Sequence, residues 1–402
     1  MTKTRVLILL STLLVVGIFG YFAILLARGY RFDIKTLKFN PNGIIVIKSD
    51  PTGAQIFVDG NLKGATDSNI SLAPGTYDVN IKKEGYLPWY KRLTVEKEIV
   101  TVANLSLFKP TPALVPITFS GATSPVMSND FSRIAFAVIP NGTSEKDKIG
   151  LWVMDTNPLP LGFNRDAKRI TDGDLTGAAW YFSPNSRDIL LKTSTGVFLL
   201  DAGSFTPQNQ RINIVSKFSS ITSSWKKEKE TKLEAQTRNL PSRLQEILKR
   251  STSAFTFSPD ENKILYSASS SGTLQSNLIP QLPGSSTQKE ERDIKIDHTY
   301  VYDIKEDRNF LVDDGVNPLS IAGGDNGGAK RRMFWLSNSH NLVLAEEGKI
   351  TVMDYDGTNR QPVYSGSFLT PYVFSYINSS KLLILTNLGA SSIPNFYSLN
   401  IK

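Results

Sequence analysis

The chain has 402 residues, of which 40% are hydrophobic and 20% are charged, an ordinary globular composition with room for two or three domains. It contains no cysteine, which excludes disulfides, thiolate zinc sites and cysteine nucleophiles. The net charge of +8 is concentrated in the first 31 residues and in Trp225–Arg250, and the remainder is about neutral. No basic surface interleaved with aromatic residues is evident, so we expect no nucleic-acid binding.

An apolar segment near the N-terminus, Val6–Ala27, contains no charged residue and is bounded by Arg5 and Arg28. A helix of this length spans the hydrocarbon core of a bilayer. We therefore expect a transmembrane helix over residues 6–27 that anchors the chain in the cytoplasmic membrane. A cleaved signal peptide is the alternative, but the segment is long for a signal-peptide core and no clean cleavage site follows it.

Flanking charge does not decide the orientation of this span. Basic residues lie on both sides of it, two before and four after: Lys3, Arg5, Arg28, Arg31, Lys35 and Lys38. We expect residues 1–5 to be a cytoplasmic stub, too short for a signalling output domain. The rest of the chain is expected outside, because a long C-terminal part is translocated largely regardless of flanking charge.

The segment Pro51–Gly60 has the most specific local pattern of the soluble part. Gly53 permits a positive φ in its first turn, Gln55–Val58 reads as a strand, and a hairpin turn signal follows. Because side chains alternate along a strand, we expect Ile56 and Val58 on the buried face.

A second turn, an alternating strand at Thr76–Ile81 and the sequence Lys83–Tyr86 follow this segment. Their order resembles the PEGA domain, a small β-sandwich named for its Pro-Glu-Gly-Ala turn, with Thr52 where the family has Glu. The resemblance covers about Gly43–Phe108 and leaves residues 28–42 as a linker. It implies a non-catalytic module that works outside the cytoplasm or at the cell surface.

The region after Pro110 repeats one pattern five times: an apolar strand, a small polar turn, a second apolar strand, and a third strand that ends in Asp or Asn. The turns begin at Ser128, Ser183, Ser258, Ser337 and Tyr376. The third strands are expected at 151–155, 197–201, 300–303, 350–354 and 396–400. Fourth strands are expected at 169–171, 212–215, 310–312 and 362–364.

Four short strands in each repeat are typical of a β-propeller blade. The Ser-Pro-Asp turns and the strands that end in Asp resemble the WD40-like repeats of periplasmic β-propellers, over about Val126–Lys402. We therefore expect an all-β chain in which the transmembrane helix precedes a PEGA-like sandwich over 43–108 and a propeller of about five blades over 109–402.

The uneven spacing of the repeats requires insertions. We expect a helical insertion over 224–250, in which Ser224 caps one helix and Pro241 lies in the first turn of a second. An exposed loop insertion is expected over 267–292. The apolar face of the second helix is expected to pack on its own propeller, with a partner-binding or membrane-surface helix as the alternative; it comprises Leu244, Ile247 and Leu248.

The fifth repeat leaves no room for a fourth strand, because its third strand reaches Asn400. An open blade has an unpaired edge, which propellers avoid. We expect Leu114–Phe119 to pair with Phe396–Asn400 and close the ring. Pro116 lacks an N–H donor, so this segment should form an outer edge.

No catalytic residue, cofactor or metal site is expected. The two histidines, His298 and His340, lie near no Gly-x-Ser-x-Gly motif, and the sequence has neither a P-loop nor a His-Glu-x-x-His motif. Asp313–Gly315 and Asp325–Gly328 are rich in oxygen ligands. They lack the alternating acidic spacing of a calcium loop, so we interpret them as turns.

Two adjacent aromatic residues, Trp89 and Tyr90, are the candidates for partner binding. They point to opposite faces of an extended strand, so one can be exposed and stack on a sugar ring or a partner surface. Packing of both within the sandwich or on the propeller is the alternative.

These features predict a non-catalytic, membrane-tethered binding or scaffold protein outside the cytoplasmic membrane. Its partner would be an envelope protein or a cell-wall glycan, engaged through the propeller and the PEGA-like domain. The alternative is an envelope hydrolase with an active site on the propeller, which clustered carboxylates or a perturbed His298 in a funnel would favour.

Overall fold

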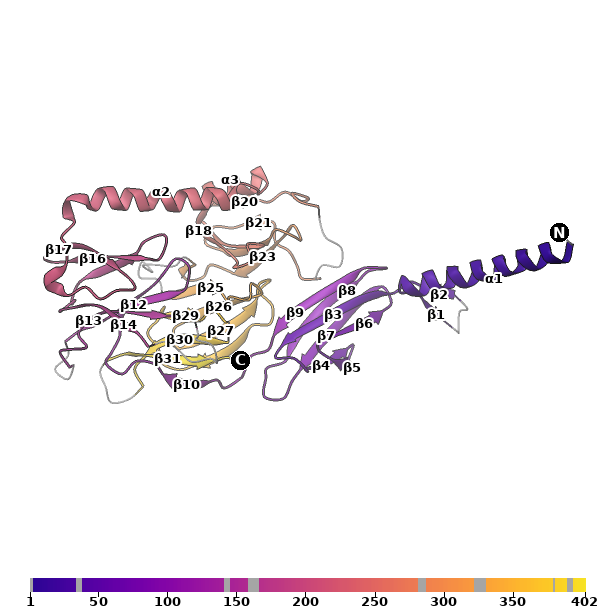
Figure 1. The fold of residues 1–402 in the computed structure, drawn as a ribbon, viewed down its shortest axis with the longest axis horizontal. Helices are drawn as coiled ribbons and strands as arrows, with labels where there is room; N and C mark the ends of the chain where they lie inside the picture. Colours follow the sequence, from indigo (N-terminus) through magenta and orange to yellow (C-terminus); the bar gives the residue numbers. More distant parts are fainter. Residues whose placement is uncertain are drawn as a thin grey trace. The chain divides into compact units, whose positions relative to one another are not determined.

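The computed structural model describes residues 3–33, 38–140, 145–157, 166–280, 287–321, 330–378, 380–388 and 393–402 (Figure 1). The chain divides into two compact units. The first comprises Met1–Leu107 with Gln281–Lys289, and the second comprises Phe108–Pro280 with Glu290–Lys402.

The first unit begins with helix α1, Lys3–Ala27. Within it, Leu7–Ala27 has a mean hydropathy of 2.5 and none of that stretch is buried, so the helix is long and apolar enough to cross a membrane. Strands β1, Arg31–Asp33, and β2, Lys38–Asn40, pair antiparallel in the expected linker.

A β-sandwich completes the first unit. One sheet has the order β6–β3–β9, in which β3 and β9 are parallel, and the other has the order β5–β4–β7–β8. The strands are β3 Gly43–Asp50, β4 Gln55–Val58, β5 Asn61–Ala65, β6 Ser68–Leu72, β7 Gly75–Lys82, β8 Trp89–Val95 and β9 Val100–Ser106. The predicted register of β4 is confirmed: Ile56 and Val58 are buried in the core between the sheets, and Gln55 is exposed.

Five β-sheets form the propeller in the described part of the second unit. Blade 1 contains β11 Thr123–Met127, β12 Arg133–Val138, β13 Gly150–Asp155 and β14 Lys168–Asp172. Blade 2 contains β15 Ala179–Phe182, β16 Asp188–Thr193 and β17 Gly196–Asp201. Blade 3 contains β18 Thr252–Phe257, β19 Lys263–Ala268, β22 Thr299–Asp303 and β23 Arg308–Asp313.

Blade 4 has five strands and blade 5 joins the two ends of the domain. Blade 4 contains β24 Leu319–Ser320, β25 Arg331–Trp335, β26 Asn341–Glu346, β27 Lys349–Asp354 and β28 Gln361–Ser365. Blade 5 contains β29 Val373–Ser375, β30 Lys381–Thr386, β31 Asn395–Asn400 and β10 Ala113–Pro116. The five predicted third strands and the fourth strands of blades 1, 3 and 4 are confirmed.

The repeated polar turns share one hydrogen-bonding scheme. In blade 1, Ser128 Oγ donates to Asp130 Oδ1 over 2.6 Å and accepts from the backbone N–H of Arg133 over 2.9 Å. The turns that begin at Ser183 and Ser258 repeat both bonds, with Asn185 and Asp260 as the acceptors. A serine followed two residues later by Asp or Asn therefore closes the hairpin, which explains why the motif recurs in register.

The predicted fourth strand of blade 2 is wrong. Residues 212–215 form only a single bridge, between Phe198 and Asn213, before a short 3-10 turn at Val215–Lys217. Ile212 is 78% exposed, so this segment has no apolar face to bury and the chain leaves the sheet.

The helical insertion begins earlier than predicted. Helix α2 spans Phe218–Thr237, so Ser224 lies inside it and does not cap it. The preceding 3-10 turn runs directly into the helix and sets its start. Helix α3, Ser242–Arg250, follows Pro241 as predicted and buries Leu244, Ile247 and Leu248 against blade 3.

The loop insertion is shorter than predicted. Ser267 and Ala268 complete β19, and the two ends of the insertion pair as β20, Gly272–Thr273, and β21, Asp293–Ile294. Residues 281–286 lie outside the described residues.

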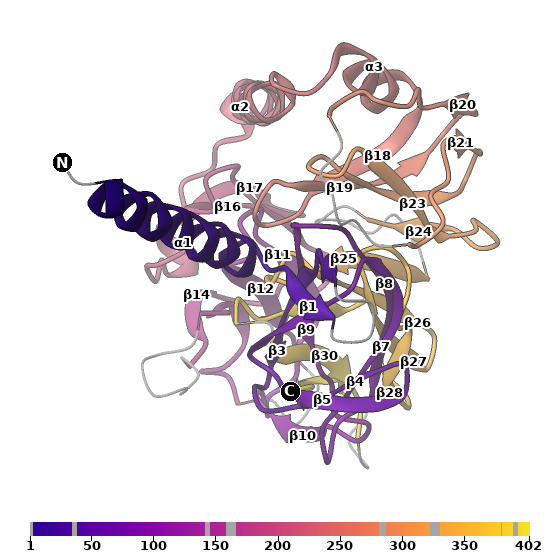
Figure 2. The same cartoon turned by 90° about the vertical axis from the view of Figure 1, so that its right-hand side faces the viewer.

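Helix α2 lies between blades 2 and 3 (Figures 1 and 2). Shared apolar clusters join blades 1 and 2, 3 and 4, 4 and 5, and 5 and 1, but none in the described part of the chain combines blades 2 and 3. Lys232 Nζ of α2 donates to the Pro184 carbonyl of blade 2 over 3.1 Å. Gln236 Nε2 donates to Glu261 Oε1 of blade 3 over 2.8 Å, so the helix bridges the two blades.

The predicted closure is confirmed. Strand β10 pairs antiparallel with β31, with Ala113 opposite Asn400 and Pro116 opposite Tyr397. Strand β10 is the outer edge of its sheet, as the proline requires. The strand ladder ends at Pro116. Beyond it, the N–H groups of Ile117 and Thr118 donate to the Phe396 carbonyl and the Phe396 N–H donates to Thr118 Oγ1, whereas Phe119 is 81% exposed.

The closing pair should set the stability of the entire propeller. Leu399 of β31 is fully buried in the cluster of blades 4 and 5, so Leu399→Ala should lower the free energy of unfolding by about 2–5 kcal/mol. Val115 of β10 is 45% exposed, and Val115→Ala should change it by less than about 0.5 kcal/mol. Deleting residues 396–402 should unfold the propeller in one transition, measured by circular dichroism. Loss of only the tail's protection from protease would contradict closure by this pair.

The sandwich should unfold independently. Replacing Ile56 with Asp places an unpaired charge in a fully buried site, and this should abolish the sandwich's thermal transition while the propeller's transition remains. Gln55→Asp, one residue away on the exposed side of β4, is the matched control and should leave both transitions unchanged. Equal effects of the two substitutions would show that the register is wrong.

Candidate functional site

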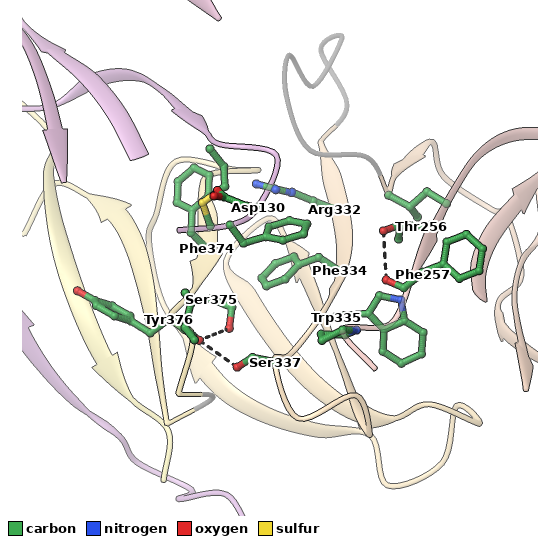
Figure 3. Close-up of a pocket in the computed structure, with 15 residues that line it drawn as sticks. Asp130, Thr256, Phe257, Arg332, Phe334, Trp335, Ser337, Phe374, Ser375 and Tyr376 are labelled. Carbon is green, nitrogen blue, oxygen red and sulfur yellow. Dashed lines mark hydrogen bonds between the residues drawn. The ribbon is translucent and has the colours of Figure 1, made fainter. Parts of the chain in front are cut away.

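A cavity of about 280 Å³ lies among strands β11, β18, β25 and β29, which belong to four blades (Figure 3). We call it the central cavity. Blades 1, 3, 4 and 5 supply its walls, which are mostly apolar and include Met127, Phe257, Phe334, Trp335, Phe374 and Tyr376. Strands β18, β25 and β29 position most of these side chains.

Arg332 of β25 is the basic residue in this lining, and it is only 3% exposed. Its guanidinium lies over the rings of Phe334 and Phe374, with centroid distances of 5.2 and 5.1 Å. Figure 3 shows its side chain extending from β25 toward Phe374 and Asp130. Its hydrogen bond runs from Nη1 to the Val373 carbonyl over 3.3 Å, and Nε has no partner among the described residues.

No carboxylate in the described part of the chain forms an ion pair with Arg332. Asp130 lines the same cavity, but its Oδ1 already accepts from Ser128 and from the backbone and side chain of Ser132. Burial opposes ionisation of Asp130, but these hydrogen bonds outweigh it and hold the pKa of its carboxyl below the ordinary value. Burial alone lowers the pKa of Arg332 to about 10, so it is still charged at neutral pH.

The adjacent arginine has the opposite environment. Side chains alternate along β25, so Arg331 points away from Arg332 and binds two acids. The Arg331 Nη2 atom lies 2.6 Å from Asp313 Oδ1, and its Nε atom lies 2.9 Å from Glu346 Oε1. Arg331 is therefore neutralised within the fold.

Two further buried polar atoms belong to residues that line the cavity. The indole Nε1 of Trp335 and the hydroxyl of Tyr376 have no hydrogen-bond partner among the described residues. The tryptophan lies on the opposite face of β25 from Arg332 and packs in the cluster shared with blade 3. The cavity thus combines apolar walls with the guanidinium of Arg332.

The two histidines lie outside the central cavity's lining. His298 Nδ1 is 3.0 Å from the Ile296 carbonyl in the turn before β22. His340 lies in the turn between β25 and β26, where its carbonyl accepts from the Tyr355 N–H. Neither forms a hydrogen bond to a serine hydroxyl that an acid–base mechanism would require, within the part of the chain described.

In the part that the structure describes, the acidic turns lack the arrangement of a calcium site. Asp313 is paired with Arg331, and no group of three His, Asp or Glu side chains in the described ranges is arranged to hold a metal ion. Asp325–Gly328 lies outside the described residues.

Trp89 and Tyr90 point to opposite faces of β8. Trp89 is 4% exposed and belongs to the sandwich core, whereas Tyr90 is 50% exposed. Tyr90 lies near Asp78, whose carboxylate accepts from Arg92 Nε over 2.6 Å. Of the two predicted residues, therefore, only Tyr90 has a surface to offer to a partner.

Sequence reasoning missed Arg332 as a site residue. The available signal was a second arginine at the start of the strand Arg331–Trp335, on the face shared with Phe334. Strand alternation predicts that one of two adjacent arginines is buried, but not which one finds a carboxylate.

The comparisons with known proteins agree with the sandwich. The family model of the PEGA domain matches residues 42–110, so this segment is a PEGA domain. A search of curated proteins found no match to the sequence.

Solved structures with a broad likeness to the chain include two TolB proteins and a propeller. A protein described as TolB from Agrobacterium tumefaciens is 12% identical with a TM-score of 0.22, over 69% of this chain and 78% of that one. TolB from Acinetobacter baumannii is 12% identical with a TM-score of 0.23, over 81% of this chain and 60% of that one. The β-propeller domain of Cps50 (Swd1) from Myceliophteria thermophila is 10% identical with a TM-score of 0.18, over 71% and 73%. We derive neither activity nor partner from likenesses at this level.

The environment of His340 should make stability depend on pH. Partial burial and the Lys263 ammonium lower its pKa, opposed by the weaker effects of Asp260 and Asp303. The unfolded chain takes up a proton near pH 6.5, whereas folded His340 does so only at lower pH. Stability should therefore fall as the pH decreases below about 6.5. His340→Asn should reduce this slope in urea unfolding series between pH 7.5 and 5, and equal slopes would contradict the assignment.

Proposed function

We propose that this chain is a non-catalytic binding protein, tethered to the cytoplasmic membrane by α1, with its N-terminus cytoplasmic and both β domains outside. The central cavity is the observation that carries the proposal. It presents apolar walls and one guanidinium, that of Arg332, which is the composition of a ligand-binding site. Its described lining contains no nucleophile paired with a base, which favours binding over the hydrolase alternative.

Two features support the proposed location. Helix α1 has the length and hydropathy of a membrane span, and none of its apolar stretch is covered by protein. The PEGA domain at 42–110 follows it, and PEGA domains belong to extracytoplasmic or surface proteins. An envelope protein or a cell-wall glycan is the partner that fits this location.

Tyr90 is the proposed contact on the PEGA domain. Its ring is half exposed beside the Asp78–Arg92 ion pair, so an apolar or sugar face can stack on it while the charges bind polar groups at the rim.

Topology and partner binding can be tested on the full chain. Protease added to intact, wall-stripped cells should degrade residues 43–402 and spare α1, and full protection until lysis would contradict the proposed orientation. The detergent-solubilised chain should sediment with purified cell-wall glycan or crosslink to an envelope protein. Tyr90→Ala should weaken this binding about tenfold because its ring is the proposed contact, whereas Leu62→Ala, at a residue 58% exposed on β5, should not.

The hydrolase alternative makes a distinct prediction. The purified chain should not cleave peptide, ester or glycan substrates, and His298→Ala and His340→Ala should have no activity to remove. Cleavage that disappears in His298→Ala would overturn the binding proposal.

A further inference from the structure

An unneutralised guanidinium inside a propeller is costly, and it needs a reason. Arg332 is 3% exposed and has no acidic partner among the described residues, so the fold bears most of the cost of removing its charge from water. The contacts of the guanidinium with the rings of Phe334 and Phe374 offset only part of that cost. Arg331, next to it, shows that the same strand can neutralise an arginine completely.

We propose that the central cavity binds a small organic carboxylate, with Arg332 as the residue that binds its anionic group. This inference names the ligand class for the proposed binding function and rests on that function. A guanidinium offers five N–H donors in a planar fork that matches the two oxygens of a carboxylate. Among the described residues, only one of these donors has a protein acceptor, at 3.3 Å.

The rest of the cavity fits the apolar body of such a ligand. Phe334 and Phe374 flank the guanidinium, and Met127, Phe257 and Trp335 supply further apolar lining. The volume of about 280 Å³ is at the lower end for ligand pockets, which favours a small molecule or a single chain end over an extended segment.

Carboxylates of this kind come from two sources, free organic acids and the C-terminal ends of peptides. Both present the same group to Arg332, so the experiment includes one arm for each. The probes are phenylacetate with its neutral isostere phenylacetamide, and a short peptide ending in phenylalanine with its amidated form. Binding to the full chain in lipid nanodiscs is measured by calorimetry and by tryptophan fluorescence.

The expected result is binding of phenylacetate or of the free-acid peptide, with the neutral or amidated form about 10- to 100-fold weaker. The stronger arm identifies the source. Equal binding of charged and neutral forms, or binding of inorganic phosphate but of neither carboxylate, would overturn the proposal. This comparison uses the unaltered chain, so it does not depend on the folding of any variant.

Substitutions in β25 separate this role from a structural one. Arg332→Gln should lose carboxylate binding by a similar factor and should keep or raise the melting temperature, because it removes an unpaired buried charge. Arg332→Lys should bind weakly, since it lacks the fork. Arg331→Gln is the matched control: it should lower the melting temperature by stranding Asp313, and it should leave carboxylate binding unchanged. Arg332→Gln that melts lower and binds normally would assign Arg332 to stability alone.

The two proposals fail separately. A chain that binds glycan or an envelope protein but no carboxylate refutes only the role of Arg332. A chain that binds phenylacetate through Arg332 but engages no envelope component refutes the proposed function and leaves the site.

Discussion

The propeller depends on one pairing between its two ends, the pairing of strands β10 and β31, in which Ala113 lies opposite Asn400. Blade 5 packs on both of its neighbours through apolar clusters, so a ring left open at blade 5 would expose the faces of two clusters at once. Strand β10 supplies the missing edge, and its proline prevents a further strand from adding outside it. The ring is thereby closed without an exposed pairing edge at this position.

The closing pair of blade 5 also supports the ring at its other weak position, the junction of blades 2 and 3. Blades 2 and 3 share no apolar cluster in the described part of the chain, and α2 joins them through hydrogen bonds of Lys232 and Gln236. Both bonds use long side chains near the surface, which stabilise much less than a packed interface. Helix α3 attaches the insertion more firmly, because it buries its apolar face on blade 3. The insertion is therefore part of the ring rather than an appendage.

The sequence predicted what local chemistry determines. The serine turns, the alternation in β4 and the incomplete fifth repeat each follow from hydrogen bonds or periodicity within a few residues, and each is confirmed. It failed at the start of α2 and at the fourth strand of blade 2. The start of α2 is set by the preceding turn, and residues 212–215 leave the sheet at a point where Ile212 is 78% exposed. Arg332 could not be assigned, because its isolation depends on which carboxylates the other blades bring near it.

In β25, the burial of an arginine and its pairing with a carboxylate are independent of each other. Because side chains alternate along the strand, Arg331 lies against Asp313 and Glu346, whereas Arg332 lines the central cavity. The interior walls are aromatic, so they exclude water and strengthen any charge interaction made there. The same low polarity that makes the free guanidinium unfavourable makes its pairing with an incoming anion favourable. A cavity of this kind is better suited to recognise charge than to serve as packing for the fold.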